Sequence, residues 1–233
     1  MTRLKHSLTA FFTLTIPLFL VLGGIRLLVT PAYTRLVYAF PNIAPDPYGF
    51  TTEERRQFAV NAVDYLLSGE DVDVLRRLSS ADGQILFNER ELGHMVDVKV
   101  VMNTAFQVGL GVFMVGVLIF FLLPLGGAAK RQMLRRGMVG GGGLALILLA
   151  ALIVYILIDW NQFFNRFHDL FFAPGTWQFR YSDGLIRLFP IPFWQNAALS
   201  LGLIVAIGAG ALIGGAVWWG RRVGKTSSDH DGV

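Results

Sequence analysis

The 233-residue chain contains no cysteine, which excludes disulfide bonds, thiolate nucleophiles, iron–sulfur ligation and lipid attachment to a cysteine of this chain. Charged residues are also scarce, at 15% of the chain against 54% hydrophobic residues. Soluble domains carry about 25% charged residues. The composition therefore predicts an integral membrane protein and excludes a thiol redox enzyme.

Four stretches are long and apolar enough to cross a hydrocarbon core about 30 Å thick, which takes roughly 20 residues of helix. We predict them at residues 8–29, 100–123, 138–158 and 196–219. The first is interpreted as a retained anchor rather than a signal peptide, because its apolar run is long and no small-residue cleavage motif follows it. The expected fold class is all-α integral membrane, a four-helix transmembrane bundle with a small extracytoplasmic cap that is mostly helical.

The predicted spans carry a packing pattern but little that a transporter needs. In the fourth span small residues recur every four positions and predict a face for close helix packing. These residues are Ala198, Gly202, Ala206, Gly210 and Gly214. No predicted span contains a central Asp, Glu, Lys or His, which argues against a proton relay or an ion pathway.

The basic residues that give the net charge of +4 lie beside the predicted spans, so we interpret them as topology signals rather than as a nucleic-acid surface. They precede the first span, fill the segment 124–137 and follow the fourth span in the tail 220–233. The segment 30–99 instead holds seven basic and eleven acidic residues, and 159–195 holds three of each. Both termini are therefore predicted to be cytoplasmic, and the segments 30–99 and 159–195 extracytoplasmic.

The predicted cap combines helix signals with helix breakers. Thr51 and Glu54 form a capping box that predicts a helix from Thr52 to Ser68. A shorter helix is expected over Val72–Leu78, and Gln84–Asn88 is a candidate short strand. Ahead of them we expect irregular chain up to Tyr48, because prolines interrupt this part. The prolines are Pro31, Pro41, Pro45 and Pro47.

Two of the four histidines, His94 and His168, fall where the predicted outer segments meet a span. On a helix, Glu91 and Asp97 lie three residues to either side of His94, close enough to orient its imidazole. His168 is followed directly by Asp169. Two titratable imidazoles in one interfacial layer, each beside carboxylates, predict a functional site.

The second outer segment is richer in aromatic residues than an interfacial belt requires. Its aromatic residues include Phe163, Phe164, Phe167, Phe171, Phe172, Trp177, Phe179, Tyr181, Phe189 and Phe193. We predict that the run Phe167–Phe172 lies flat in the interface as a re-entrant or amphipathic segment. Such a surface would hold acyl chains near the histidines.

The segments ELGHMVDVKVVM (91–102) and NRFHDLFFAPGTWQFRYSDGLIRLFPIPFW (165–194), together with four spans, resemble the bacterial lipoprotein intramolecular transacylases. The resemblance implies an acyltransferase of the bacterial cytoplasmic membrane with its active site at the extracytoplasmic face. It implies acyl transfer from the glycerol sn-2 ester of a diacylglyceryl lipoprotein to the α-amine of that lipoprotein's N-terminal cysteine, which leaves a lyso-form lipoprotein. Diacylglyceryl lipoproteins and membrane phospholipid are then the partners, His94 and His168 are the catalytic residues, and no cofactor or metal is expected.

The chemistry assigns provisional roles to these residues. We take His168 as the general base and His94 as the oxyanion stabiliser or acid, with the order left open. Lys99, Arg187 or backbone amides are alternative partners of the oxyanion. The candidate substrate-binding residues are Asp97, Lys99, Asn165, Phe171, Trp177, Asp183 and Arg187.

Two other classes of protein fit the same residues. A metalloenzyme would use His94, His168 and nearby carboxylates as ligands, although the sequence has no HExxH motif or close histidine pair. A non-enzymatic membrane scaffold or envelope sensor would keep the spans and the cap, with purely structural histidines. Substitution of each outer histidine discriminates among the three.

Overall fold

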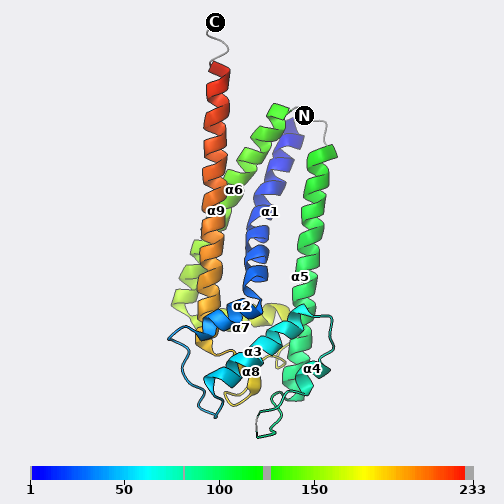
Figure 1. Ribbon diagram of the computed structural model, residues 1–233. Coiled ribbons are helices and arrows are strands. Elements are labelled where there is room, and N and C mark those ends of the chain that lie inside the picture. The colour runs from blue at the N-terminus through cyan, green and yellow to red at the C-terminus, as the bar shows by residue number, and fades with distance from the viewer. Residues whose placement is uncertain (1, 81, 123–126, 229–233) are drawn as a thin grey trace. The chain divides into compact units, whose positions relative to one another are not determined.

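The computed structural model describes residues 2–80, 82–122 and 127–228, and these residues are mainly helical (Figure 1). The helices are α1 (Thr2–Leu28), α2 (Pro31–Tyr38), α3 (Thr52–Leu67), α4 (Asp73–Arg76), α5 (Glu89–Leu122), α6 (Gly127–Ile158), α7 (Trp160–Phe171), α8 (Gly184–Leu188) and α9 (Ile191–Ser228). The last residue of the predicted second span, Leu123, lies outside the described residues. So do residues 124–126 of the basic segment and His230 in the tail.

Four of these helices are long and apolar enough to cross a membrane, which confirms the predicted class. The candidate spans are His6–Leu28, Glu89–Leu122, Gly127–Ile158 and Ile191–Arg221. α5, α6 and α9 each begin before the predicted apolar stretch. Much of the basic segment 124–137 is therefore the first part of α6 rather than a loop.

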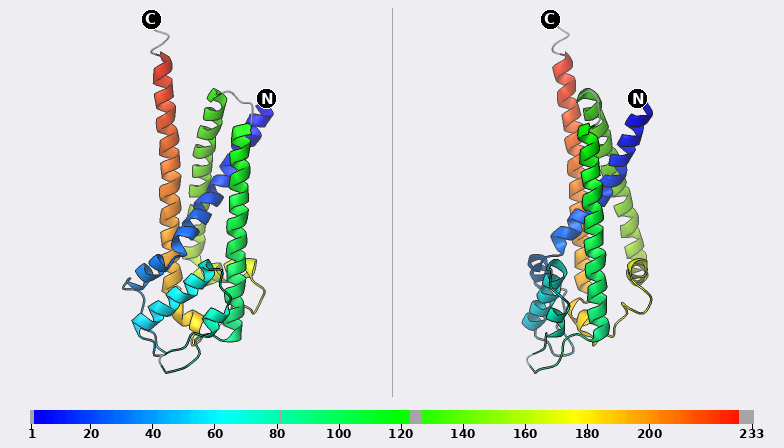
Figure 2. Two further views of the ribbon diagram at one scale, coloured as in Figure 1. Left: turned by 45° about the vertical axis from the view of Figure 1, so that its right-hand side comes forward. Right: turned by 90° about the vertical axis from the view of Figure 1, so that its right-hand side faces the viewer.

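The chain divides into two compact units, and the first contains residues 1–24, 106–157 and 202–233. Within this unit, parts of α1, α5, α6 and α9 run alongside one another (Figures 1 and 2). The start of α1, the end of α5, the start of α6 and the end of α9 lie at the same end of the unit. The described parts of the segments predicted to be cytoplasmic from their basic residues therefore share one end of this unit.

The small-residue pattern of α9 is only partly a packing face, so that prediction is wrong for two of its members. A Cβ atom built on Gly202 would meet Leu149, but one on Gly210 or Gly214 would meet nothing within 4 Å. The close approach occurs instead at Gly142 of α6, where a Cβ atom would lie 2.8 Å from Ile213 Cγ1. Sequence spacing identified small residues on α9 but not the side that α6 covers.

The second unit contains residues 25–105 and 158–201, and it holds every outer residue singled out in the sequence. Its core is a cluster of buried apolar side chains. They are Tyr33, Val37, Tyr38, Ala59, Ala62, Tyr65, Leu75, Leu86, Phe87, Leu92, Met95, Leu185, Leu188 and Phe193. The core draws on both predicted outer segments, so the cap and the aromatic segment form one folded body.

The expectation of irregular chain before Tyr48 is wrong for residues 31–38, which form α2. Thr30 caps this helix by accepting a hydrogen bond from Tyr33 N at 3.2 Å, and Pro31 occupies the first helical position. Proline is favoured there because the first turn leaves its N–H groups unpaired in any case. A proline after a threonine therefore starts a helix here instead of breaking one.

The predicted helix over residues 52–68 is confirmed as α3. Its capping box is present, with Glu54 N donating to Thr51 Oγ1 and Thr51 N donating to Glu54 Oε2 at 2.9 Å. The short helix expected over Val72–Leu78 is confirmed as α4. The candidate strand at Gln84–Asn88 is wrong, since this segment makes only an isolated bridge from Ile85 to Ser79.

A buried polar network fixes α8 against the loop before α3. Arg187 forms an ion pair with Asp46 at 2.7 Å, and its guanidinium lies 3.3 Å from the centroid of the Phe50 ring. Burial alone would raise the pKa of Asp46, but hydrogen bonds from Arg187 and from the Phe50 N–H outweigh burial and hold that pKa below its ordinary value. Arg55, which is buried, donates to the carbonyl oxygens of Arg187 and Ala44.

Candidate functional site

His94 lies in α5, about one turn after the residues that cap the start of this helix, Asn88 and Glu91. Asn88 Oδ1 accepts hydrogen bonds from the N–H groups of Arg90 and Glu91, and Glu91 Oε2 accepts one from Asn88 N at 2.9 Å. The other carboxylate oxygen, Glu91 Oε1, accepts from Leu185 N at 2.7 Å. Both oxygens of this buried carboxylate are thus engaged by backbone N–H groups, and Glu91 orients α5 and α8 instead of the imidazole.

His168 lies near the end of α7, a strongly amphipathic helix. Asp159 caps α7 by accepting from Gln162 N at 2.9 Å. Helical spacing places Trp160, Phe163, Phe164, Phe167 and Phe171 on one side and the polar residues on the other. His168 lies at the border of these two faces. The predicted amphipathic segment is confirmed as α7, which begins at Trp160 and ends at Phe171, so that Phe172 is already extended. That it lies flat in the interface stays a prediction.

The structure brings His94 and His168 together. Their ring centroids are 6.2 Å apart and their planes differ by 28°, so the two imidazoles are stacked. Phe172 and Phe179 meet the His94 ring with centroid distances of 4.7 Å and 5.5 Å. Phe164 lies 4.1 Å from the His168 ring. The two imidazoles therefore share one cluster of aromatic side chains, the aromatic pocket, although 74 positions separate them in the sequence.

The hydrogen bond of His168 defines its tautomer. His168 Nδ1 lies 2.8 Å from the carbonyl oxygen of Phe164. A carbonyl oxygen only accepts, so Nδ1 carries the proton and Nε2 keeps its lone pair. Burial lowers the pKa of His168 below its ordinary value, and this effect outweighs the Phe164 carbonyl and the Asp169 carboxylate, which both raise it. The geometry is that of a neutral imidazole ready to accept a proton at Nε2.

Two buried nitrogen atoms of the site have no hydrogen-bond partner among the residues that the structure describes: His94 Nδ1 and Trp177 Nε1. His94 is 9% exposed and Trp177 is 6% exposed. The Trp177 ring lies 4.8 Å from the His168 ring, at 31° to it. Buried polar atoms are normally paired, so two unpaired ones around the same imidazole indicate a place where another molecule binds.

The loop that follows α7 is tied to α5 by Arg90. The guanidinium of Arg90 donates to the carbonyl oxygens of Gln178 at 2.6 Å and Gly175 at 3.4 Å, and it lies 5.6 Å from the Phe179 ring. Gly175 adopts a φ of 83°, which L side chains rarely adopt, and this conformation permits the turn. Arg90 thereby holds Trp177 and Phe179 near the imidazoles.

Arg90 was missed in the sequence, although one signal was available. It lies in the first turn of α5 between Glu89 and Glu91. A cation is unfavourable at this end of the helix dipole, so a basic residue there points to a partner elsewhere in the fold.

The other predicted site residues take different places. Trp177 lies against His168, whereas Phe171 and Asp97 are exposed. Lys99 donates to the Glu70 carbonyl at 2.7 Å and lies 4.0 Å from the Tyr65 ring. Both cations predicted as partners of the oxyanion are therefore engaged elsewhere, because Arg187 is paired with Asp46.

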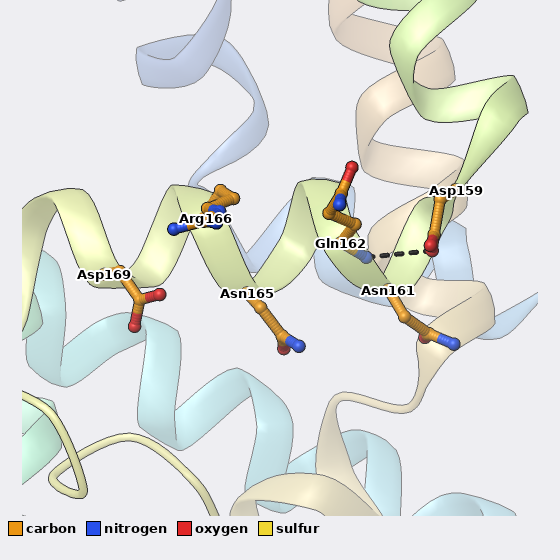
Figure 3. Close-up of a pocket in the computed structure, with 6 residues that line it drawn as sticks. All are labelled: Asp159, Asn161, Gln162, Asn165, Arg166 and Asp169. Carbon is orange, nitrogen blue, oxygen red and sulfur yellow. Dashed lines mark hydrogen bonds between the residues drawn. The ribbon is translucent and has the colours of Figure 1, made fainter.

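Of two further predicted residues, Asp183 stabilises a turn and Asn165 lies on an open surface. Asp183 Oδ2 accepts from Arg180 N at 2.8 Å and stabilises the turn before α8. Asn165 lies on the polar face of α7 (Figure 3), where it lines a polar pocket of about 400 Å³. The other residues that line the pocket are Asp159, Asn161, Gln162, Arg166 and Asp169. The pocket is an open depression on the polar face of α7, and neither histidine lines it.

Within the described part of the chain, no three His, Asp or Glu side chains are grouped so that they could hold a metal ion.

The four long helices and the folded body that carries two stacked imidazoles among aromatic rings define an integral membrane protein with a histidine-containing aromatic cluster. The sequence profile of the lipoprotein intramolecular transacylase (Lit) family matches residues 10–194. The chain belongs to this family, which confirms the resemblance found in the two outer segments.

Solved structures share the fold over nearly the whole chain. The membrane-integral lipoprotein intramolecular transacylase of Bacillus cereus superimposes with a TM-score of 0.73 at 21% identity, covering 98% of this chain and 99% of that one. A variant of the Bacillus cereus protein with one histidine replaced by arginine gives a TM-score of 0.66 at 19% identity, covering 97% of this chain and 96% of that one. An uncharacterized protein of Aquifex aeolicus (strain VF5) is 25% identical over 179 residues, which are 77% of this chain and 79% of that protein.

Proposed function

We propose that this protein transfers an acyl chain within a diacylated lipoprotein, from the sn-2 ester of the glyceryl group to the α-amine of the N-terminal cysteine. The observation that carries the proposal is the stacked pair of imidazoles in an aromatic pocket, 6.2 Å apart, with the Nδ1 proton of His168 bound to a carbonyl. Family membership supplies the reaction class, and the pocket supplies a base next to apolar surface.

The first step is removal of a proton from the substrate amine. An α-amine has an ordinary pKa of about 8 and is mostly protonated at neutral pH. His168 Nε2 takes this proton, and the resulting imidazolium keeps its Nδ1–H bond to Phe164 O. The free amine then attacks the carbonyl carbon of the sn-2 ester.

The attack forms a C–N bond and places negative charge on the former carbonyl oxygen. His94 donates a hydrogen bond to this oxygen from Nδ1, in the tautomer that carries the proton there. When the tetrahedral intermediate collapses, the bond to the glyceryl oxygen breaks and the His168 imidazolium returns its proton to that oxygen. The nitrogen still carries one proton more than an amide, and it releases this proton through the neutral His168 Nε2 to solvent. One ester and one amine become one amide and one alcohol, so the mass of the lipoprotein is unchanged.

Proximity supplies much of the rate because both reacting groups belong to one molecule. The aromatic face of α7 gives the acyl chains an apolar surface beside His168. No acyl-enzyme is formed. The absence of cysteine from the chain is therefore no obstacle to the reaction.

The test is mass spectrometry of a synthetic diacylated lipopeptide incubated with the purified protein. We expect a product of unchanged mass whose fragmentation places one acyl chain on the amine, in the presence of a chelator and without an added acyl donor. An equimolar mixture of two lipopeptides with differently labelled acyl chains should give no crossed product. Crossed products, or acyl chains that come from labelled phospholipid, would overturn the intramolecular mechanism.

A matched pair of outcomes separates this proposal from the two other classes. Loss of turnover on chelation would support a metalloenzyme. Absence of any O-to-N transfer by folded wild-type protein would support a membrane scaffold or sensor.

A further inference from the structure

Trp177 Nε1 and His94 Nδ1 are the two buried nitrogen atoms of the site that have no hydrogen-bond partner in the described structure. The indole N–H can only donate, and a buried indole normally finds an acceptor. Trp177 is 6% exposed, and its Nε1 makes no hydrogen bond to any of the described residues. The Trp177 N–H is therefore a buried hydrogen-bond donor without an acceptor among the described residues.

The Trp177 indole lies next to His168, the proposed general base. The indole and the imidazole of His168 have ring centroids 4.8 Å apart and planes tilted by 31°, so the indole lies directly beside the base. The indole is held firmly, because Arg90 donates to the carbonyl oxygen of Gln178, the next residue, at 2.6 Å. A donor held in place beside a general base has the arrangement required to stabilise an oxyanion.

We propose that the Trp177 Nε1–H donates a hydrogen bond to the carbonyl oxygen of the sn-2 ester and stabilises the oxyanion that forms there. The inference rests on the proposed function and adds a second donor to His94 Nδ1, the other unpaired buried nitrogen of the pocket. The two cations that sequence reasoning offered for this task are engaged, Lys99 with the Glu70 carbonyl and Arg187 with Asp46.

This role predicts an effect on kcat rather than on KM. The hydrogen bond strengthens as charge moves from the ester carbonyl onto a full oxyanion, so its removal raises the barrier more than it weakens binding. Removal of one oxyanion donor from an enzyme lowers kcat by roughly 10²–10³-fold.

The experiment compares Trp177→Phe, which removes the N–H and keeps an aromatic ring, with Trp194→Phe as a matched control. Trp194 lies on α9 at 38% exposure. We expect kcat for O-to-N transfer to fall about 10²-fold or more in Trp177→Phe with KM nearly unchanged, and Trp194→Phe to behave as the wild type. Replacement of Trp177 by 3-benzothienylalanine, an isostere without the N–H, should reproduce the loss without a change in ring size.

A binding measurement tests the hydrogen bond without turnover. In protein labelled with ¹⁵N at its tryptophans, the Trp177 indole N–H resonance should move downfield when a lipopeptide with an acetylated α-amine is added. Wild-type kcat in the benzothienylalanine protein, or an indole resonance that does not move while the probe binds, would overturn the role of Trp177. Absence of transfer by the wild type would instead overturn the proposed function.

Discussion

The two imidazoles differ at the residue scale in what their nitrogen atoms contact, and this difference makes their roles separable. We expect His168→Ala and His94→Ala each to lower the rate of O-to-N transfer by roughly 10²–10⁴-fold. Glutamine should distinguish them, because its amide donates a hydrogen bond but cannot act as a base. His94→Gln should therefore retain part of the activity, whereas His168→Gln should retain none above the alanine variant.

The measurement is the initial rate of N-acylation by purified variants whose thermal unfolding midpoints match that of the wild type. His6→Ala is the control, since His6 belongs to α1 in the other compact unit. Greater activity in His168→Gln than in His94→Gln would exchange the two roles. Near-normal rates in both alanine variants would remove the histidines from the mechanism.

The lowered pKa of His168 predicts the pH dependence of the reaction. A base with a lowered pKa is neutral, and therefore active, at pH values above that pKa, and it loses activity as the pH falls through it. The acid limb of the kcat profile should thus lie below about 6.5, the ordinary value for histidine. Asp169 raises the pKa of His168, so Asp169→Asn should move this limb to still lower pH.

Asp64→Asn, which changes an exposed carboxylate on α3, serves as the control and should leave the profile in place. An acid limb above the ordinary histidine value, or a shift to higher pH in Asp169→Asn, would contradict the environment assigned to His168.

At the scale of elements, Glu91 connects the start of α5 to the start of α8. Its carboxylate accepts two backbone hydrogen bonds, from Asn88 N and Leu185 N, and the side chain is buried at 1% exposure. In Glu91→Gln one oxygen becomes an NH₂ group, which cannot accept, so one buried N–H is left unpaired. We expect the variant to lose about 1–3 kcal/mol of stability, measured as a lower midpoint of thermal unfolding in detergent.

Glu89→Gln is the matched control, because Glu89 is in the same turn but its side chain is 76% exposed in a surface ion pair with Arg76. Such a pair contributes about 0–1 kcal/mol, so its loss should change the midpoint little. Equal midpoints for the two variants would show that the link between α5 and α8 does not support the fold.

The elements also show which parts of the fold were accessible from the sequence. The four spans were predicted from the length of their apolar runs, and α3 was predicted from its capping box. Both signals are local in the sequence. α2 was missed because Pro31 was treated as a breaker although Thr30 caps a helix there. The histidine pair was found from its position beside two spans, but the bond from Leu185 N to Glu91 joins residues 94 positions apart. Contacts of that kind depend on tertiary packing, which periodicity and spacing do not encode.

At the scale of the whole molecule, the proposed reaction requires the site to face the side on which lipoproteins mature. Both histidines lie in the unit formed by residues 25–105 and 158–201, in segments where acidic residues equal or outnumber basic ones. In the segments that precede the first span, join the second and third, and follow the fourth, basic residues outnumber acidic ones. Positive charge is retained on the cytoplasmic side, so we propose that both termini are cytoplasmic and that the site is extracytoplasmic.

Reporter fusions test this orientation directly. Fusions after Ser80 and Gly175 should be active only as extracytoplasmic reporters, and fusions after Lys130 and Val233 only as cytoplasmic ones. Replacement of the four basic residues of the second predicted cytoplasmic segment, Lys130, Arg131, Arg135 and Arg136, by glutamine should weaken the preference, because it removes the charge that holds this segment inside. A cytoplasmic signal from either histidine-bearing segment in the wild type would separate the imidazoles from their substrate. The acyl-transfer mechanism would then be untenable whatever the geometry of the pocket.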